Sequence, residues 1–337
     1  MRGAALGALV STAGSGCSRP APAHNGVGAL VDVTYVTGFG SFGREAFAWV
    51  AAAKGFFSDV GLKVTIVAGA AGNANLDMIG SNRAQFAEID YSGALVRVGN
   101  GVRNFRCVAA LNQQTLIALM ALEGQQHRVI APKDLEGRTV GYAAGAVPFT
   151  LFPAYAGLAK INAGAVKWVT GTPQQLPLML ASGAVDAVGQ FVAGAPALQH
   201  AAGGRSVVTL PYSDYLTDLY GNVLVTSTRL AKEDPGLVLR FTGALLWGLQ
   251  DTVRDPEGAA RILHAAVPAM DEGTAAAEIR LLKPYIDTVG TLGAFDPVRV
   301  ARSVAVLQSL GLYPSGFDPV EVVDFSVVRN EKVSPSR

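Results

Sequence analysis

Two stretches of the sequence, Met78-Ile-Gly-Ser-Asn-Arg-Ala-Gln-Phe-Ala87 and Met179-Leu-Ala-Ser-Gly-Ala-Val-Asp-Ala187, have the pattern of one structure written twice. Each is typical of a helix end, a tight turn and the start of a strand. Asn82 and Gly183 occupy the turn, 101 residues apart, and Asn and Gly most readily adopt the left-handed conformation that ends a helix. This period is too long for a solenoid and predicts two similar α/β lobes. Small ligands commonly bind in the cleft between two lobes.

The surrounding sequence supports the same duplication. A strand pattern precedes each turn, Gly61-Leu-Lys-Val-Thr-Ile-Val in one copy and Gly164-Ala-Val-Lys-Trp-Val in the other. Strand and helix patterns alternate from Val31 to Leu210, and helices dominate from Pro235 onward. This order predicts an α/β protein whose sheets are rich in parallel strands.

The composition excludes several classes of protein. Lys and Arg number 27 and Asp and Glu 26 in 337 residues, so the net charge is only +1. A nucleic-acid-binding protein would need a basic patch or stripe, and the sequence has none, so we expect no nucleic-acid partner. Cys17 and Cys107 make no disulfide framework, and Cys107 is predicted to be a buried strand residue. The four histidines are scattered, and we expect no metal site and no cofactor.

The amino terminus resembles a bacterial export signal, predicted to span residues 1–17. Gly14-Ser-Gly-Cys17 resembles a lipobox, in which the cysteine is lipidated, although Gly14 stands where that motif usually has Leu. Residues 18–30 are predicted to form a flexible tether. We therefore expect an extracytoplasmic protein, in the periplasm or on the outer face of the cytoplasmic membrane, with a lipid anchor at Cys17. The alternative is a disordered start on an unanchored protein.

A glycine-rich loop has two interpretations beyond a plain connection. Gly38-Phe-Gly-Ser-Phe-Gly43 fits the G-x-G-x-x-G pattern of dinucleotide-binding proteins. Such a site needs an acidic residue at the end of the next strand, and Thr65-Ile-Val-Ala-Gly69 has none. The second interpretation pairs this loop with Ala143-Ala-Gly-Ala-Val147 of the other lobe. Free backbone N–H groups at the two helix starts would then face an anion or a polar edge across the cleft.

Several motifs in combination resemble the substrate-binding proteins of ABC importers for nitrate, sulfonates, taurine and thiamine pyrimidine precursors. They are Ala53-Lys-Gly-Phe-Phe-Ser-Asp-Val-Gly-Leu-Lys-Val64, Asp134-Leu-Glu-Gly-Arg-Thr-Val-Gly141, Leu180-Ala-Ser-Gly-Ala-Val-Asp-Ala187, Asp234-Pro-Gly-Leu-Val-Leu-Arg240 and Asp255-Pro-Glu-Gly-Ala-Ala260. The resemblance covers about residues 31–315. It implies a type II periplasmic-binding fold, in which each lobe is a mixed sheet flanked by helices.

The resemblance also implies how the lobes are divided and which partners they meet. Lobe 1 is expected to comprise residues 31–114 and 216–337, and lobe 2 residues 115–215, with hinge crossovers near Asn112–Thr115 and Tyr212–Asn222. The implied partners are a small-molecule ligand and the permease and ATPase subunits of an importer that recognise the closed form. We expect a monomer.

The expected binding site follows from the rule that ligands of α/β sheets lie at the carboxyl ends of the strands. The predicted ligand-binding residues are Thr37, Gly38, Phe39, Phe42, Asp90, Tyr91, Ser92, Gln113, Gly145, Ala146, Val147, Phe149, Gln190, Phe191, Tyr220 and Asn222. Aromatic rings are frequent in this set, and each stacked pair contributes about 0.5–1.5 kcal/mol beyond area burial. The set favours a flat heteroaromatic ligand, such as a pyrimidine-type precursor. Sulfonate, taurine or nitrate is the alternative, although Arg44 is the only nearby cation predicted, and each aromatic could instead serve lobe packing.

No catalytic residue is predicted. Enzymes with this fold, such as a sulfinate desulfinase or a pyrimidine synthase, need a reactive residue at the cleft. Cys17 precedes the fold and Cys107 lies in a strand pattern, so an enzyme is only the second alternative. Asp186, which occupies the position of Gln85 in the other copy of the turn, is predicted to cap backbone N–H groups.

Overall fold

The computed structural model describes residues 29–70, 72–144, 146–172, 174–286, 290–316, 318 and 321–329. The strands are β1 (Val31–Val36), β2 (Phe39–Gly40), β3 (Leu62–Val67), β4 (Gly69–Ala70), β5 (Phe86–Asp90), β6 (Phe105–Ala110), β7 (Ile117–Leu122), β8 (Thr139–Ala143), β9 (Lys167–Gly171), β10 (Ala187–Phe191), β11 (Val207–Pro211) and β12 (Asn222–Ser227). The helices are α1 (Ala46–Ala53), α2 (Phe56–Asp59), α3 (Gly72–Gly80), α4 (Tyr91–Gly99), α5 (Val147–Ala159), α6 (Leu176–Ala181), α7 (Ala195–Ala201), α8 (Thr228–Glu233), α9 (Pro235–Arg254), α10 (Pro256–Ala266), α11 (Glu272–Ile286) and α12 (Pro297–Ser309).

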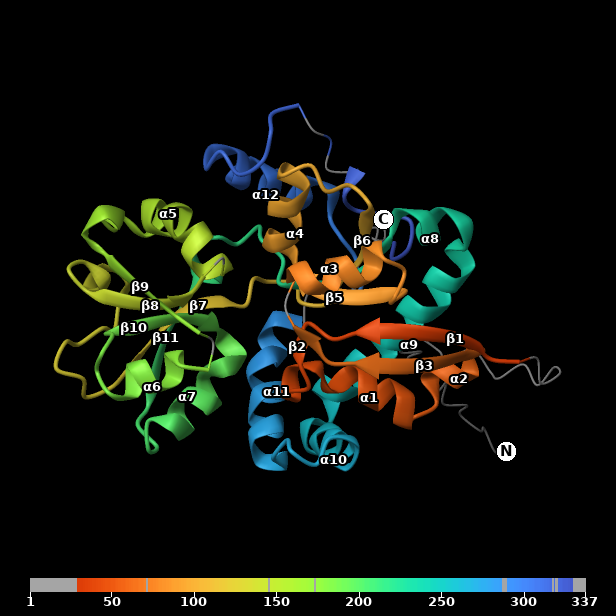
Figure 1. Ribbon diagram of the computed structural model, residues 1–337, viewed down its shortest axis with the longest axis horizontal. Coiled ribbons are helices and arrows are strands. Elements are labelled where there is room, and N and C mark those ends of the chain that lie inside the picture. Colours follow the sequence, from red (N-terminus) through yellow and green to blue (C-terminus); the bar gives the residue numbers. More distant parts are fainter. Residues whose placement is uncertain are drawn as a thin grey trace, which may run out of the picture.

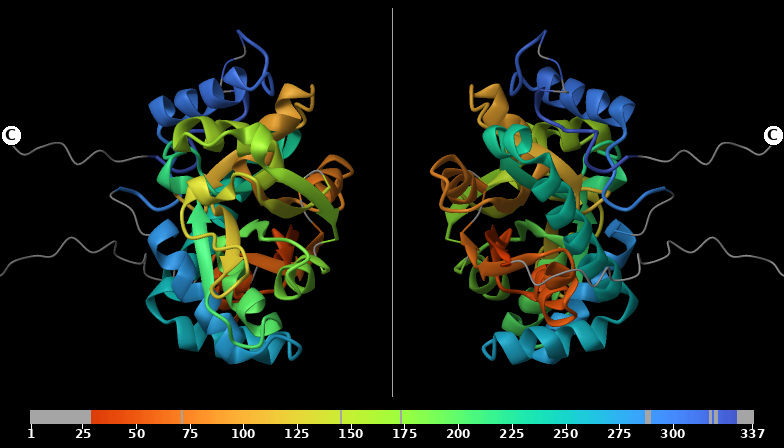
Figure 2. Two further views of the ribbon diagram at one scale, coloured as in Figure 1. Left: turned by 90° about the vertical axis from the view of Figure 1, so that its left-hand side faces the viewer. Right: turned by 90° about the vertical axis from the view of Figure 1, so that its right-hand side faces the viewer.

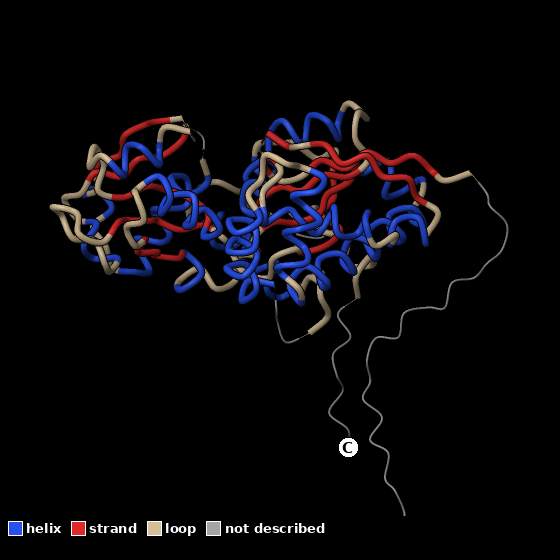
Figure 3. The backbone as a smooth tube through the Cα atoms, turned by 90° about the horizontal axis from the view of Figure 1, so that it is seen from below, coloured by secondary structure: helices blue, strands red, loops and turns tan. Residues whose placement is uncertain are grey.

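Two five-stranded sheets have the same topology, as the duplicated turn predicts. The order is β3-β1-β5-β12-β6 in the first and β9-β8-β10-β7-β11 in the second. In each sheet the fourth strand runs antiparallel to both of its neighbours, and the first three are parallel. The two groups of strands lie side by side in separate halves of the molecule (Figure 1, Figure 3). We call the half around the first sheet lobe 1 and the other half lobe 2.

The duplicated turns take the conformation that the sequence predicts. The φ angles of Asn82 and Gly183 are 58° and 77°, both left-handed. The following side chain then caps the neighbouring strand, since Thr34 N donates to Gln85 Oε1 (2.8 Å) in lobe 1 and Thr139 N donates to Asp186 Oδ2 (2.8 Å) in lobe 2. The prediction that Asp186 caps a backbone N–H is confirmed.

Alternating residues of β1 face two different cores in lobe 1. Tyr35 packs toward α9, where Phe241 stacks on Phe86 with ring centroids 3.9 Å apart. Val36 belongs to the opposite core, which α3, α4 and α12 cover. Figure 1 shows these helices on one side of the first sheet and α1, α2 and α9 on the other. Cys107 is fully buried in β6, as predicted.

Some predictions fall outside the part of the chain that the structure describes. These are the signal segment 1–17 with Cys17, the first eleven residues of the tether 18–30, and Gly145. Among the described helices, none is both long and apolar enough to cross a membrane.

Candidate ligand-binding site

The carboxyl ends of the parallel strands of lobe 1 point toward lobe 2. Figure 1 shows the arrowheads of β1 and β3 directed at the other lobe. The helix after β5, α4, begins at this edge and approaches the first residue of α5 from lobe 2. A Cβ added to Gly93 of α4 would lie 3.7 Å from Val147 Cγ2. Two helix amino ends therefore meet where the lobes face each other.

Three N–H groups of the glycine-rich loop of lobe 1 are already bonded to side-chain carboxyl groups, so the prediction that they are free for a ligand is wrong. Gly38 N donates to Glu88 Oε2 (3.2 Å), and Phe42 N donates to Glu45 Oε2 (3.1 Å). Gly43 N donates to Oε2 of Glu278 in α11 (2.8 Å). The loop sequence alone could not reveal this, because Glu88 and Glu278 are distant in the chain. Side-chain carboxylates occupy the positions where an anionic ligand would have been bound.

Carboxyl groups outnumber cations around this loop. The Arg44 guanidinium pairs with Glu45 (Nε–Oε1, 2.8 Å) and lies 4.9 Å from the centroid of the Phe42 ring. Burial raises the pKa of Glu88 to about 7, and the nearby charge of Glu45 acts in the same direction. Burial also raises the pKa of Glu278 to about 7. Arg44, the one cation predicted for the site, is therefore already engaged.

Asp90 is one of three consecutive residues at this edge, with Tyr91 and Ser92, that have a buried polar atom without a hydrogen-bond partner among the described residues. It ends β5 and caps α4, where its Oδ1 accepts a hydrogen bond from Gly93 N (2.9 Å). Its Oδ2 is buried and has no hydrogen-bond partner among the described residues. Burial raises the pKa of this carboxyl to about 7. A buried oxygen without a partner is costly, so Asp90 offers an unused hydrogen-bonding position.

The predicted site residues divide into two groups by burial. Thr37, Tyr91, Ser92, Gln113, Tyr220 and Asn222 are buried. Gly38, Phe39, Phe42, Asp90, Ala146, Val147, Phe149, Gln190 and Phe191 are partly or largely exposed. Tyr91 and Tyr220 pack edge-on at 5.3 Å and both contact Phe295, so their rings fill the core of lobe 1. For these two tyrosines the structure supports the packing alternative.

Other buried members of the set organise the loops. Asn222 Nδ2 donates to Glu88 Oε1 (2.6 Å), and Thr37 Oγ1 accepts from Gly69 N (2.9 Å). Gln113 Nε2 donates to Ala294 O (3.2 Å) in the segment before α12. These side chains fix the positions of the segments around the expected site and are not free to contact a ligand through these atoms.

Each lobe contributes an aromatic cluster with exposed rings. In lobe 1, Phe39 and Phe42 are nearly parallel, 13° apart in plane and 6.3 Å apart in centroid. In lobe 2, Phe149 stacks on Tyr142 at 4.4 Å with the edge of Trp168 at 5.1 Å. Phe42 is 36% and Phe149 40% exposed. Large exposed rings are suited to stacking on a flat ligand.

Sequence reasoning missed several residues that build this edge. Tyr142 and Trp168 lie on the paired strands β8 and β9, and only the pairing of those strands brings them together. Asn75 of α3 is buried and binds the carbonyls of Thr37 (2.8 Å) and Glu88 (2.8 Å). Glu88 could have been found, because a carboxylate inside an otherwise apolar strand is unusual.

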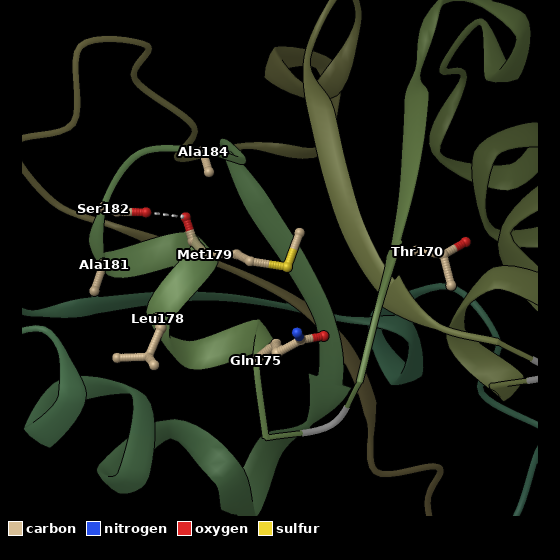
Figure 4. A pocket seen from close by; sticks show the side chains of 7 residues that line it. All are labelled: Thr170, Gln175, Leu178, Met179, Ala181, Ser182 and Ala184. Carbon is tan, nitrogen blue, oxygen red and sulfur yellow. Dashed lines mark hydrogen bonds between the residues drawn. The ribbon is translucent and has the colours of Figure 1, made fainter.

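An open depression on lobe 2 runs along α6, from the carboxyl end of β9 to the turn after the helix (Figure 4). Its lining residues are Thr170, Gln175, Leu178, Met179, Ala181, Ser182 and Ala184. They include the duplicated turn at the base of the lobe and no charged side chain. The depression therefore offers hydroxyl and amide groups but no charged side chain to a ligand. The described residues also contain no cluster of three or more His, Cys, Asp or Glu that could hold a metal ion.

Two α/β lobes of equal topology, joined by two crossovers, define a type II periplasmic-binding fold. The chain belongs to the family described as NMT1/THI5 like, which matches residues 45–259. No curated protein matches the sequence.

Solved structures share the fold at low sequence identity. The periplasmic aliphatic sulphonate-binding protein SsuA from Escherichia coli is 13% identical, with a TM-score of 0.71 over 91% of this chain and 96% of that one. The ligand-binding component of an ABC-type import system from Staphylococcus aureus, solved with zinc, is 14% identical, with a TM-score of 0.67 over 89% and 98%. The desulfurization enzyme DSZB is 16% identical, with a TM-score of 0.58 over 84% and 93%.

Proposed function

We propose that the protein is the extracytoplasmic solute-binding component of an ABC importer, which closes its lobes on a small organic ligand. The family, the fold and neighbours that are import components support this proposal. The partners would be the permease and ATPase subunits, and the protein would work as a monomer. A lipid at Cys17 would hold it at the membrane.

The ligand we favour is a flat heteroaromatic molecule that carries hydrogen-bond donors, such as an aminopyrimidine. The observation that carries this choice is the unpartnered Asp90 Oδ2 at the lobe-facing end of β5. A ligand N–H group would satisfy that oxygen. Phe39 and Phe42 in lobe 1 and Phe149 in lobe 2 would supply ring faces for stacking.

The alternative ligand, a sulfonate, taurine or nitrate, receives less support. The backbone donors at Gly38, Phe42 and Gly43 already bind carboxylates. An anion would have to displace these groups, and as Glu88 and Glu278 ionise above about pH 7 it would also meet repulsion that the low dielectric of a buried site strengthens.

The enzyme alternative also receives less support. A cysteine nucleophile needs an accessible thiolate with a lowered pKa. Cys107 is fully buried in β6, and burial raises the pKa of its thiol well above the ordinary value. The similarity in fold to the desulfurization enzyme DSZB therefore gives no support for a cysteine nucleophile at Cys107.

A thermal-shift screen of the purified protein tests the proposal. The compounds would be aminopyrimidines, flavin-like rings, aliphatic sulfonates with taurine, and nitrate. A true ligand at one hundred times its Kd stabilises the protein by about 2.7 kcal/mol. Stabilisation by sulfonates or nitrate alone would contradict the heteroaromatic assignment, and stabilisation by none of them would leave the importer proposal without a ligand of the expected classes.

A pair of matched variants then locates the ligand. Asp90→Asn keeps the capping oxygen for Gly93 N and replaces the acceptor Oδ2 by an NH2 donor. Asp255→Asn makes the same change where Asp255 Oδ1 caps Gly258 N (2.9 Å), away from the site. We expect the stabilisation by an aminopyrimidine to be lost in Asp90→Asn and kept in Asp255→Asn. Equal stabilisation in the two variants would place the ligand elsewhere.

A further inference from the structure

The two crossovers between the lobes, residues 111–116 and 212–221, are bonded to each other. Thr115 N donates to Leu219 O (3.0 Å), and Gly221 N donates to Asn112 O (3.0 Å). These hydrogen bonds hold the two chain segments side by side. Any rotation of lobe 2 against lobe 1 must change the backbone angles in these segments.

One side chain from the carboxyl-terminal part of the chain binds both crossovers. Arg299 Nη2 donates to Gln113 O in the first crossover and to Leu219 O (3.1 Å) in the second. Its Nε donates to Asp218 O (3.1 Å), also in the second crossover. The guanidinium carbon lies 3.9 Å from the centroid of the Tyr220 ring. The planar guanidinium thus contacts three carbonyls and an aromatic face at once, which an ammonium could not do.

The helix that carries Arg299 is fixed to lobe 1. Val300, Val304 and Leu307 of α12 are buried in the same core as Leu95 and Val98 of α4. In Figure 1 α12 and α4 lie on one side of the lobe 1 sheet, and Figure 2 shows α12 on that side in both views. Arg299 therefore reaches the crossovers from a rigid support.

Two further hydrogen bonds join α12 and its N-cap residue to the second crossover. Asp296 N donates to the hydroxyl of Tyr220 (2.8 Å), and Ser303 Oγ donates to Asp218 O (2.7 Å). Arg302, one turn along the helix, contacts the second crossover only through the Asp218 side chain (Nε–Oδ1, 2.9 Å) and is exposed. Arg299 alone among these residues binds carbonyls of both crossovers.

We propose that Arg299 is a positioning residue for the hinge, which ties both crossovers to α12 and limits the motion of lobe 2. Hydrogen bonds from a charged donor are stronger than those between neutral groups, and three of them must rearrange when the crossover carbonyls move. The proposal follows from the two-lobed fold and does not depend on which ligand is bound.

Hydrogen exchange in the ligand-free protein provides the first test. Arg299→Met removes the guanidinium and keeps an unbranched apolar side chain, and Arg302→Met is the matched control on the same helix. We expect the amides of Thr115 and Gly221 to exchange faster by about ten-fold or more in Arg299→Met. In Arg302→Met they should stay within about two-fold of the wild type. Equal acceleration in both variants, or acceleration spread evenly over β1 and β8, would overturn the proposal.

Distances between the lobes provide the second test. Spin labels at Lys63→Cys in lobe 1 and Lys167→Cys in lobe 2, with Cys17→Ser, would report the distribution of inter-lobe distances by pulsed electron resonance. We expect a broader distribution for Arg299→Met than for the wild type and Arg302→Met. An unchanged distribution overturns the proposal even if exchange increases.

A second substitution keeps the tests decisive if Arg299→Met does not fold. Arg299→Lys retains the charge but cannot bridge both crossovers with one planar group, so it should show the same two changes to a smaller extent. Failure of both variants to fold would also overturn the proposal, because Arg299 would then be a folding residue of lobe 1.

Discussion

The two carboxyl oxygens of Asp90 have opposite effects on the stability of the folded protein. Its Oδ1 caps α4, which stabilises the helix, while its buried Oδ2 has no partner among the described residues. The raised pKa of this carboxyl is the expected result, because burial disfavours the charged form. A buried group that lowers the stability of the folded protein is a candidate for function, because a bound ligand would supply the hydrogen bond that Asp90 Oδ2 lacks.

The pH dependence of stability should reveal this cost. The folded pKa of Asp90 is about 7 and the ordinary value is 3.8, so the folded state holds its proton over a range where the unfolded state has lost it. The contribution of Asp90 is therefore full below its ordinary value and is lost as the pH rises through about 7. In that range the free energy of unfolding falls by about 1.4 kcal/mol per pH unit from this group.

We expect Asp90→Asn to flatten the decrease in stability between pH 5 and pH 8, measured by urea unfolding without ligand. Asp255→Asn should leave the wild-type slope unchanged. Glu88 and Glu278 also have pKa values raised to about 7 by burial, so some decrease must remain in every variant. A wild-type slope in Asp90→Asn would mean that this carboxyl is ionised throughout the range.

At the scale of secondary-structure elements, the duplicated turn shows what local sequence can decide. Asn82 and Gly183 adopt positive φ because the helices before them must end before the next strand begins. Their local sequences therefore predicted the helix ends, the strand starts and the capping role of Asp186. The acidic partners of the Gly38–Gly43 loop were missed, since Glu88 and Glu278 reach it only through the sheet and α11.

Two glycines that both have room for a Cβ atom, but differ in backbone conformation, test why the turn after α6 needs glycine. A Cβ at Gly183 or at Gly157 of α5 would meet nothing within 4 Å. Gly183 has a φ of 77°, so Gly183→Ala should lower the free energy of unfolding by about 1–2 kcal/mol. Gly157 lies inside a helix, and Gly157→Ala should raise it by about 0.5–1 kcal/mol. Urea unfolding would measure both, and effects of the same sign would contradict the backbone explanation.

On the scale of the whole molecule, the crossovers decide how two similar lobes become one protein. The antiparallel strand of each lobe follows a crossover. The chain leaves lobe 1 through the first crossover and forms β7 in lobe 2, and it returns through the second crossover to form β12 in lobe 1. Neither sheet is complete without a segment that follows a crossover. The crossovers must therefore be packed closely enough to bond to each other, to α12 and to Arg299.

Gly221 permits this close approach. A Cβ there would lie 2.6 Å from Gln114 O and 2.7 Å from Asn112 Cβ, both in the other crossover. We expect Gly221→Ala to lower the free energy of unfolding by about 1–3 kcal/mol, because the two segments must separate. Gly243→Ala in α9, where a Cβ would meet nothing within 4 Å, is the control and should be neutral or stabilising. Wild-type stability in Gly221→Ala, by urea unfolding, would show that the crossovers have room to move apart.

The sequence by itself determined the features that depend on neighbours in the chain. These are the repeated strand–turn pattern, the two α/β lobes, the buried position of Cys107 and the edge of the sheets where a ligand is expected. Short-range patterns report them because hydrophobic period and turn conformation are set within a few residues.

Only the tertiary structure decided the chemistry at that edge. It brought Glu88 and Glu278 to the glycine-rich loop, placed Tyr91 and Tyr220 in the core, joined Tyr142 and Trp168 to Phe149, and set Arg299 on both crossovers. Each of these contacts joins segments that meet only after the sheets have formed and the helices have packed on them. Their free energy depends on burial and on the distance between charges, which the folded arrangement alone establishes.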